Sequence, residues 1–325
     1  MAANQPPNRF YRGGERIAEF RTQPGRGPRV PEDWVGSVTP LFGEVELGLT
    51  LLESGAVLAE EVRADPQFWL GSAHVARYGA DAALLVKLLD AGQRLPVHAH
   101  PTVQWAHEHL GISHGKTEAW VFLADATVWM GFTRNIAQSE MAAWVKNQDA
   151  EGMLAAMHEL HAEAGDAIVV PAGTPHAIGE GAFIVEVQEP TDLSILMEWR
   201  DLDIDGLAEG HLGLGFDTAL GAVSRSASSR EEIERLRNTT RADVGNLLPD
   251  AADFFRVERY RDDAVLEPGF SVVVVTHGNG VLTSATGQTI RLKRGLTVLL
   301  AHASGTWKAT ESEGLEFLRC RPPAP

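Results

Sequence analysis

The stretch Gly165-Asp-Ala-Ile-Val-Val-Pro171-Ala-Gly173-Thr-Pro-His176 decides the fold. Its first half is a short apolar, β-branched run that is typical of a buried strand. Pro171 and Gly173 then favour a tight turn, because proline fixes one backbone dihedral and glycine adopts conformations that other residues avoid. The turn predicts that His176 points back into the mouth of a β-barrel.

A matching pattern lies upstream, where Gly92 precedes His98 and His100 in the spacing Gly-x5-His-x-His. The two histidines are two residues apart, so in a strand both imidazoles project from one face and can bind one ion. An isolated His-x-His pair is weak evidence for a metal site. Together, however, the two patterns are the two halves of the cupin signature. We therefore expect a mainly β fold, a cupin barrel (a double-stranded β-helix or jelly roll) with helical insertions.

A carboxylate ligand is expected between the two halves, and Glu118 stands at the start of the apolar run in Gly115-Lys-Thr-Glu-Ala-Trp-Val-Phe-Leu123. Three imidazoles and one carboxylate predict a single divalent ion and suit zinc, manganese, iron, nickel or cobalt. The alternative makes Glu118 a surface strand residue and His176 a turn histidine, but it must explain both patterns at once.

Three further polar residues are candidates for the same site. Lys116 shares the strand parity of Glu118 and should point to the same face, although a solvated lysine at a strand start is an equal alternative. Glu186 and Gln188 alternate on an otherwise apolar strand, which indicates a polar cavity unless they face solvent. Other histidines carry less weight: His107, His109 and His114 fall in a loop, and His158 and His161 fall on a predicted helix.

The spacing of apolar residues changes along the chain between helix-like and strand-like patterns. Residues 1 to about 45 are rich in Pro, Gly and Arg, as in an extended arm. Helical patterns are expected over Leu47 to about Leu95, with a start at Asp65-Pro66, and over Ser139 to Leu160. A further helical pattern is expected over about Asp217 to Leu236, with a capping box at Ser228-Ser-Arg-Glu231. Short β runs are expected at 95–100, 117–123, 126–132, 167–170 and 183–188.

A second β-rich region covers residues 253 to 323 and carries only His277 and His302. Those two histidines are separated by several expected strands, so no second metal site is predicted. We expect a metal-binding domain over residues 1–240, including the arm and the insertions, and a metal-free β-domain over residues 241–325.

Charge and cysteine content limit the class of partner. The 325 residues include 28 basic and 44 acidic side chains, a formal net charge of -16, which argues against nucleic acid or an anionic membrane surface. The single cysteine, Cys320, excludes an internal disulfide. With no leader-like start and no long apolar segment, we expect a soluble cytoplasmic protein that acts on a small molecule. The oligomeric state stays open.

Beyond the cupin signature, the chain resembles the class I mannose-6-phosphate isomerases, particularly the shorter bacterial type. The resemblance is carried by Pro31-Glu-Asp-Trp-Val-Gly36, Leu84-Leu-Val-Lys-Leu-Leu-Asp-Ala-Gly92, Gly115-Lys-Thr-Glu118, the turn up to His176, and Glu186-Val-Gln-Glu189. It implies a zinc site of His98, His100, Glu118 and His176, a metal-free C-terminal cupin-like barrel, and a sugar or sugar phosphate as substrate. It also places Trp34 and Gln188 among the substrate-binding residues.

The chain departs from that family at two positions. His98 stands where the family has a glutamine ligand, which returns the site to the general cupin pattern. Leu196 stands where the family has an arginine that contacts substrate and phosphate, with Arg134 and Arg200 as candidate replacements. A non-phosphorylated or differently phosphorylated sugar is therefore expected as substrate at least as much as mannose 6-phosphate.

The residues and the resemblance together predict an aldose-ketose isomerase. Its proton-transfer base is expected to be Lys116 or Glu186, since one group must reach the protons of both reacting carbons. Two alternatives remain. The same ligand set can hold iron and activate oxygen in a cupin oxygenase, and a cupin can also bind a sugar without turnover.

Overall fold

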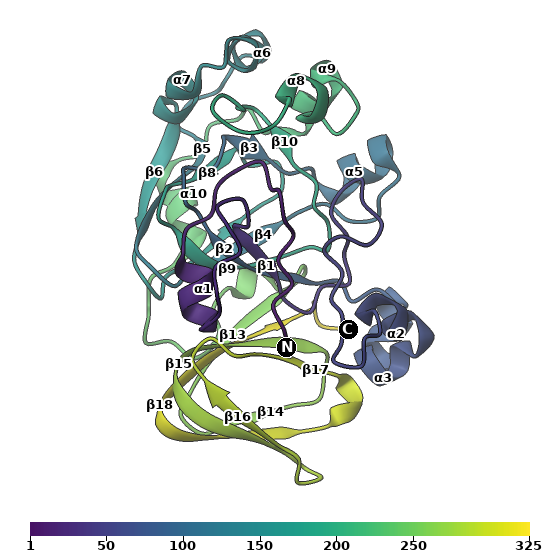
Figure 1. Cartoon of the computed structure of the whole chain (residues 1–325). Helices are drawn as coiled ribbons and strands as arrows, with labels where there is room; N and C mark the ends of the chain where they lie inside the picture. Colours follow the sequence, from purple (N-terminus) through teal and green to yellow (C-terminus); the bar gives the residue numbers. More distant parts are fainter.

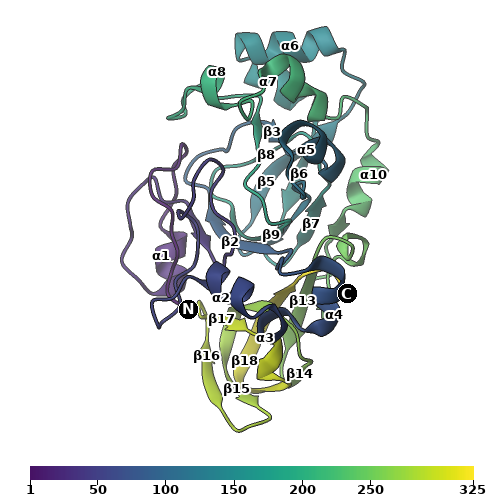
Figure 2. The ribbon, with the colours of Figure 1, turned by 90° about the vertical axis from the view of Figure 1, so that its right-hand side faces the viewer.

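The computed structural model describes residues 1–325 and is mainly β, with three antiparallel sheets. Figures 1 and 2 show two of these sheets in the middle of the molecule and the third at one end. At the other end lie helices α6 (Gln138–Asn147), α7 (Ala150–Ala155) and α8 (Gly206–Glu209). No helix is both long enough and apolar enough to cross a membrane.

The first two sheets face each other. The first has the strand order β1 (Glu32–Trp34), β2 (Leu85–Asp90), β9 (Phe183–Gln188), β4 (Glu118–Phe122), β7 (Ala167–Val170), β11 (Arg237–Asn238). The second has the order β10 (Ile195–Leu196), β3 (His98–Ala99), β8 (His176–Ile178), β5 (Ala126–Phe132), β6 (Met157–Ala162). A core that includes Trp120 and Ile184 from the first sheet and Met130 and Ile178 from the second lies between them. This packing places β4 and β9 opposite β3 and β8.

The third sheet is built from the C-terminal part of the chain. Its strands are β12 (Gly245–Asn246), β13 (Arg256–Arg261), β14 (Ala264–Leu266), β15 (Ser271–Ser284), β16 (Thr289–Lys293), β17 (Thr297–Leu300) and β18 (Trp307–Arg321). One cluster of 27 buried residues joins it to the first sheet, with Val86 and Val185 on one side and Val274 and Leu318 on the other. The expected division at residue 240 stays a prediction, because the two units share this core.

The helices are short and lie at the periphery. They are α1 (Arg16–Arg21), α2 (Leu58–Ala64), α3 (Pro66–Leu70), α4 (Ser72–Tyr78), α5 (Val103–Leu110), α6 (Gln138–Asn147), α7 (Ala150–Ala155), α8 (Gly206–Glu209), α9 (Phe216–Ala219) and α10 (Arg230–Arg235), with short 3₁₀ turns η1 (Leu220–Ala222), η2 (Pro249–Ala251) and η3 (His302–Ser304). Asp65 caps α3 through its side chain, as expected. The expected extended arm contains α1 and β1.

Two expected helical stretches are wrong in part. Residues 85–90 form strand β2 rather than the end of a helix, and residues 157–162 form strand β6, so His158 and His161 lie on a strand. All six residues of β2 are buried, and a strand that is buried on both faces lacks the alternation that would distinguish it from a helix. The capping box forms one residue later than predicted, between Ser229 and Glu232.

Gly92 of the signature is required by a close approach of two chain segments. Its N–H donates to the carbonyl of Arg12 at 2.9 Å. A Cβ atom on Gly92 would lie 2.2 Å from the carbonyl oxygen of Gly13. The N-terminal segment therefore crosses directly over Gly92, which holds that segment against the barrel.

We expect Gly92→Ala to lower the free energy of unfolding by about 1 to 3 kcal/mol, because backbone must move to admit the methyl group. Urea unfolding followed by circular dichroism measures the change. Gly221→Ala is the matched control, since a Cβ there meets only Trp105 at 3.8 Å. Equal stability of both variants would contradict this account of Gly92.

Candidate metal centre

Three buried histidines converge at the mouth of the barrel. His98 lies on β3 directly opposite His176 on β8, and His100 follows β3 by one residue. One ring nitrogen from each of the three lies within 4.8 Å of the others. Residues separated by up to 78 positions in sequence are thus brought together by strand pairing.

Backbone carbonyls fix the orientation of each imidazole. Nδ1 of His98 lies 2.9 Å from the carbonyl of Pro96, Nδ1 of His100 lies 2.7 Å from that of Leu193, and Nδ1 of His176 lies 2.8 Å from that of Thr174. A carbonyl only accepts, so each Nδ1 must carry the proton and donate it. In the neutral ring Nε2 is then a bare lone pair, which is the form that binds a metal.

Glu118 completes the cluster from β4. Its carboxylate oxygens lie 3.0 Å from Nε2 of His100 and 3.3 Å from Nε2 of His176. Nε2 of His176 has no hydrogen-bond partner. Acceptors that face one another in a dry site are unfavourable unless a cation lies between them. The donor set therefore fits a divalent ion held by three imidazoles and one carboxylate.

Lys116 lies beside the same cluster. Its Nζ is 2.9 Å from Nε2 of His100 and 2.8 Å from Glu118. Burial lowers the pKa of His100 to about 3, and the charge of Lys116 adds to this effect. Burial alone would raise the pKa of Glu118, but Lys116 and His100 hold it well below its usual range. His100 is therefore neutral and Glu118 ionised over a wide pH range.

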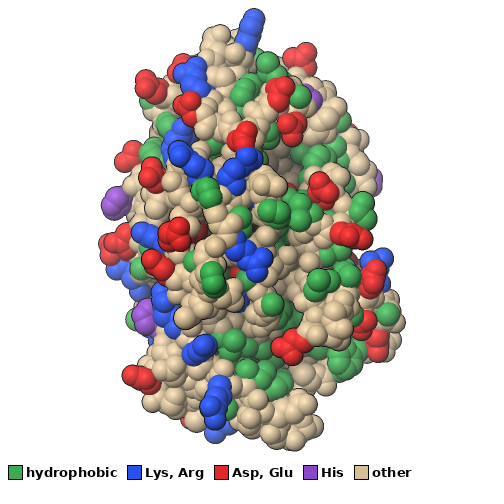
Figure 3. All heavy atoms as spheres, in the orientation of Figure 1, with side chains coloured by type: hydrophobic (Ala, Val, Ile, Leu, Met, Phe, Trp, Pro, Cys, Tyr) green, Lys and Arg blue, Asp and Glu red, His purple; other side chains and the backbone are tan.

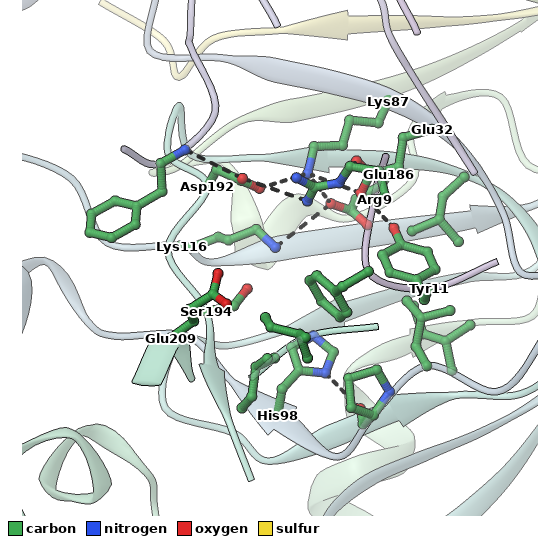
Figure 4. Close-up of a pocket in the computed structure, with 18 of the residues that line it drawn as sticks. Arg9, Tyr11, Glu32, Lys87, His98, Lys116, Glu186, Asp192, Ser194 and Glu209 are labelled. Carbon is green, nitrogen blue, oxygen red and sulfur yellow. Dashed lines mark hydrogen bonds and ion pairs between the residues drawn. The ribbon is translucent and has the colours of Figure 1, made fainter. Parts of the chain in front are cut away.

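A cavity of about 320 Å³ opens next to His98, Lys116 and Glu118. Figure 4 shows His98 on one side of it and a group of charged side chains on the other. Its charged lining residues are Arg9, Glu32, Lys87, Lys116, Glu118, Glu186, Asp192 and Glu209. Five of these are acidic and three are basic, so the cavity does not carry an excess of cations.

Lys87 links the acidic residues of this cavity. Its Nζ lies 3.4 Å from Glu186, 3.7 Å from Asp192 and 3.8 Å from Glu32, and 4.6 Å from the centre of the Trp34 ring. Burial alone would lower the pKa of Lys87, but the three carboxylates raise it above its usual value. Lys87 is therefore a fixed positive charge.

Glu186 has an unusual environment within this group. Burial raises the pKa of its carboxyl, Lys87 opposes that effect, and Glu118 adds to it. One of its oxygens, Oε1, has no hydrogen-bond partner. This oxygen belongs to a residue that lines the cavity and lies 3.8 Å from Nζ of Lys116. A carboxylate in this position is available to accept a proton from a bound molecule.

The N-terminal segment contributes residues that the sequence did not indicate. Arg9 pairs with Glu32 at 3.0 Å and with Asp192 at 3.6 Å, and the hydroxyl of Tyr11 donates to Glu32 at 2.6 Å. Arg9 and Tyr11 lie in the stretch that was expected to be an arm. Lys87 was also missed, although a lone lysine inside the apolar run of residues 84–89 was a usable signal.

The predicted substrate-binding residues are not brought together. Trp34 is fully buried behind Lys87 and donates to Glu32. Gln188 is fully buried and donates to the carbonyl of Thr191 at 2.5 Å. Neither lines the cavity. Arg134 pairs with Glu140 on the surface, and Arg200 donates to the carbonyl of Asn147, so both lie outside the cavity.

Leu196 does line the cavity. It lies on β10 directly opposite His98. An apolar side chain thus occupies the wall beside the candidate ligands, at the position where the resemblance implies an arginine.

His114 was expected in a solvated loop but is held by two carboxylates. It lies 2.5 Å from Asp81 and 3.8 Å from Glu189. Burial alone would lower its pKa, but the hydrogen bonds to Asp81 and Glu189 raise it to about 9. Glu189 also accepts from the N–H of Thr117 at 2.7 Å. His114 therefore supports the loop that precedes Glu118.

Comparison with known proteins confirms the resemblance. No family model matches the chain. It is 31% identical over 164 residues to a mannose-6-phosphate isomerase of Bacillus subtilis, covering 48% of this chain and 51% of that one. It is 38% identical over 125 residues to a mannose-6-phosphate isomerase of Streptococcus mutans, covering 38% and 37%. The matches thus span about half or less of the length of these curated relatives.

Solved structures extend the similarity of fold to the whole chain. A mannose 6-phosphate isomerase from Bacillus subtilis superimposes with a TM-score of 0.72 at 20% identity, covering 98% of this chain and 97% of that one. A mannose 6-phosphate isomerase bound with zinc and yttrium superimposes with a TM-score of 0.73 at 13% identity, covering 99% and 98%. At these identities the superpositions show the fold.

We expect His100→Ala and Glu118→Ala each to lose the bound ion, because no neighbouring side chain can replace a ligand held in this geometry. Elemental analysis of purified, dialysed protein measures the metal content. His109→Ala, on the surface of α5, is the control and should keep one ion per chain. Stoichiometric metal in both ligand variants would rule out the four-residue site.

Proposed function

Because the chain is a divergent relative of the mannose-6-phosphate isomerases, we propose that it is a metal-dependent aldose-ketose isomerase. The observation that carries the proposal is the convergence of His98, His100, His176 and Glu118 beside a cavity that also contains Glu186 and Lys116. Carbonyl isomerisation needs a group that accepts a proton and positive charge that stabilises the developing oxyanion. A metal site beside Glu186 and Lys116 provides both.

We propose zinc as the ion and the same four residues as its ligands. When bound there, a divalent ion would supply Lewis-acid stabilisation of the negative charge that develops on the sugar oxygens. The proposal of zinc is supported by the three imidazoles, by Glu118, and by the zinc named in a structural neighbour.

Two side chains are candidates for moving the proton between the sugar carbons. Glu186 offers a carboxylate oxygen without a hydrogen-bond partner. Lys116 offers an ammonium group that lies 3.8 Å from this oxygen. With Glu186 as the base, its carboxylate takes the proton from one carbon and returns it to the other, while the Lys116 ammonium stabilises the oxygen that becomes negative. Lys116 would act as the base only as the neutral amine. The neighbouring Lys87 keeps Glu186 in place.

We propose that the preferred substrate is a neutral sugar. The carboxylates of the cavity outnumber its cations, and each cation is already paired: Arg9 with Glu32, Lys87 with Glu186, and Lys116 with Glu118. Leu196 adds no charge. A phosphate dianion would therefore lose its hydration without gaining a free cation in return.

The finer division of the fold is also a proposal. Residues 1–240 would form the metal-binding cupin domain and residues 241–325 a second, metal-free cupin-like domain. The change from the first sheet to the third between β11 and β12 supports it.

The activity test compares unmodified, zinc-loaded protein with Glu186→Gln and Lys116→Met on a panel of aldoses. Ketose formation is expected, and loss of the base should lower kcat by about 10²- to 10⁴-fold while the metal content is unchanged. Elemental analysis and oxygen uptake are measured on the same samples. Oxygen consumption with iron would support the oxygenase instead, and sugar binding without turnover would support a non-catalytic cupin.

The substrate test compares kcat/KM for mannose, a pentose and mannose 6-phosphate. The unmodified enzyme should not prefer the phosphorylated sugar. Leu196→Arg should raise the ratio of kcat/KM for mannose 6-phosphate to kcat/KM for mannose by roughly ten- to a hundredfold. The reason is that a charge-assisted bond is typically worth about 1.5 to 3 kcal/mol. Leu196→Gln controls for the loss of the apolar wall. A strong preference of the unmodified enzyme for mannose 6-phosphate would contradict the proposal.

A further inference from the structure

A second cavity, of about 220 Å³, lies where the first and third sheets meet. Its wall includes Phe20 of α1, Phe122 at the end of β4 and Gly165 in the turn before β7. Val121, Leu123 and Ala164 lie on the same side of the cavity, and Arg241 comes from the loop between β11 and β12. The rest of the wall comes from the third sheet and the turn after β16. The cavity shares no residue with the one beside the metal ligands.

Arginines dominate the charged lining of this cavity. Arg241, Arg259, Arg261 and Arg294 line it together with His277, and Glu316 is the single lining carboxylate. The chain as a whole carries a net charge of -16. On the face shown in Figure 3, acidic and basic side chains are interspersed. The four arginines around this small cavity therefore form a cluster of basic side chains in a chain that is acidic overall.

Two of the arginines are neutralised by carboxylates and two are not. Arg261 pairs with Glu316 at 2.7 Å, and Arg241 pairs with Glu163 and Asp166 at 2.9 Å each. Arg294 lies on the surface, with its guanidinium 5.0 Å from the centre of the Phe20 ring, and forms no ion pair. It is therefore free to bind an anion.

Arg259 is the decisive residue. Arg259 as a whole residue is 1% exposed. It donates to the carbonyls of Gly165 at 2.6 Å and Arg241 at 2.9 Å, but its Nε has no partner and it forms no ion pair. A buried cation without an anion is unfavourable, and a bound anion in the cavity would offset that cost.

We propose that this cavity binds a phosphate group, either as inorganic phosphate or as the phosphate of a small phosphomonoester. Guanidinium groups match the geometry of phosphate oxygens and donate two bonds at once. The cavity is small enough to exclude a macromolecule from its interior. Arg294 and His277 are exposed, which leaves an entrance for a dianion. The site is independent of the proposed isomerase activity.

Isothermal titration of the zinc-loaded protein with inorganic phosphate tests the proposal. The expected result is saturable binding of one phosphate per chain. Arg294→Gln should weaken it at least about fivefold, since one charge-assisted contact is lost. This variant should fold, because the Arg294 side chain makes no hydrogen bond and its main-chain bond to Gly278 is kept. Arg259→Met should weaken binding further where it folds.

Arg63→Gln is the matched control, because Arg63 is an exposed arginine on α2 that lines neither cavity. Its phosphate affinity should equal that of the unmodified protein. No binding at millimolar phosphate, or an affinity that Arg294→Gln leaves unchanged, would overturn the proposal, since phosphate on the metal ion would not depend on Arg294. A second titration with glycerol 3-phosphate identifies the source: tighter Arg294-dependent binding than inorganic phosphate assigns the site to a phosphomonoester, and equal binding assigns it to the free anion.

Discussion

Three hydrogen bonds from imidazole Nδ1 atoms to backbone carbonyls support everything else at the metal centre. The carbonyls belong to Pro96, Thr174 and Leu193, which lie just before β3, in the turn before β8 and just before β10. Each carbonyl selects the tautomer that leaves Nε2 unprotonated, so the ligands are prepared before an ion arrives. Because the acceptors are backbone atoms, the ligand geometry is as rigid as the second sheet itself.

The cavity beside these ligands shows how the chain handles buried charge. Arg9, Lys87 and Lys116 are each compensated by a carboxylate at short range. Burying ionised groups is tolerable only when they are paired in this way. The consequence for recognition is that the cavity offers hydrogen-bonding groups to a polyhydroxy compound while its net charge leaves little attraction for an anion. The arginine-lined cavity where the first and third sheets meet differs, because its basic side chains outnumber its single carboxylate.

The sequence predicts the part of the site in which local pattern and tertiary structure agree. The turn that ends at His176 and strand β9 with Glu186 follow from glycine, proline and alternation, and the strand has the expected bounds. Gln188 shares that alternation but does not line the cavity. Lys87 was missed because β2 is buried on both faces and has no alternation. Arg9 was missed for a different reason, since its role depends on an N-terminal segment that crosses over Gly92, and no local pattern encodes that long-range contact.

The hydrophobic cluster that joins the first and third sheets makes distant parts of the chain thermodynamically interdependent. Val185 on β9, the strand that carries Glu186, and Val274 on β15 belong to the same cluster. Opening that cluster would disturb the strands that position the metal ligands, although no residue of the third sheet reaches them. Metal affinity and the integrity of the C-terminal strands are therefore linked functions, and any ligand that binds only the folded chain stabilises both sheets at once.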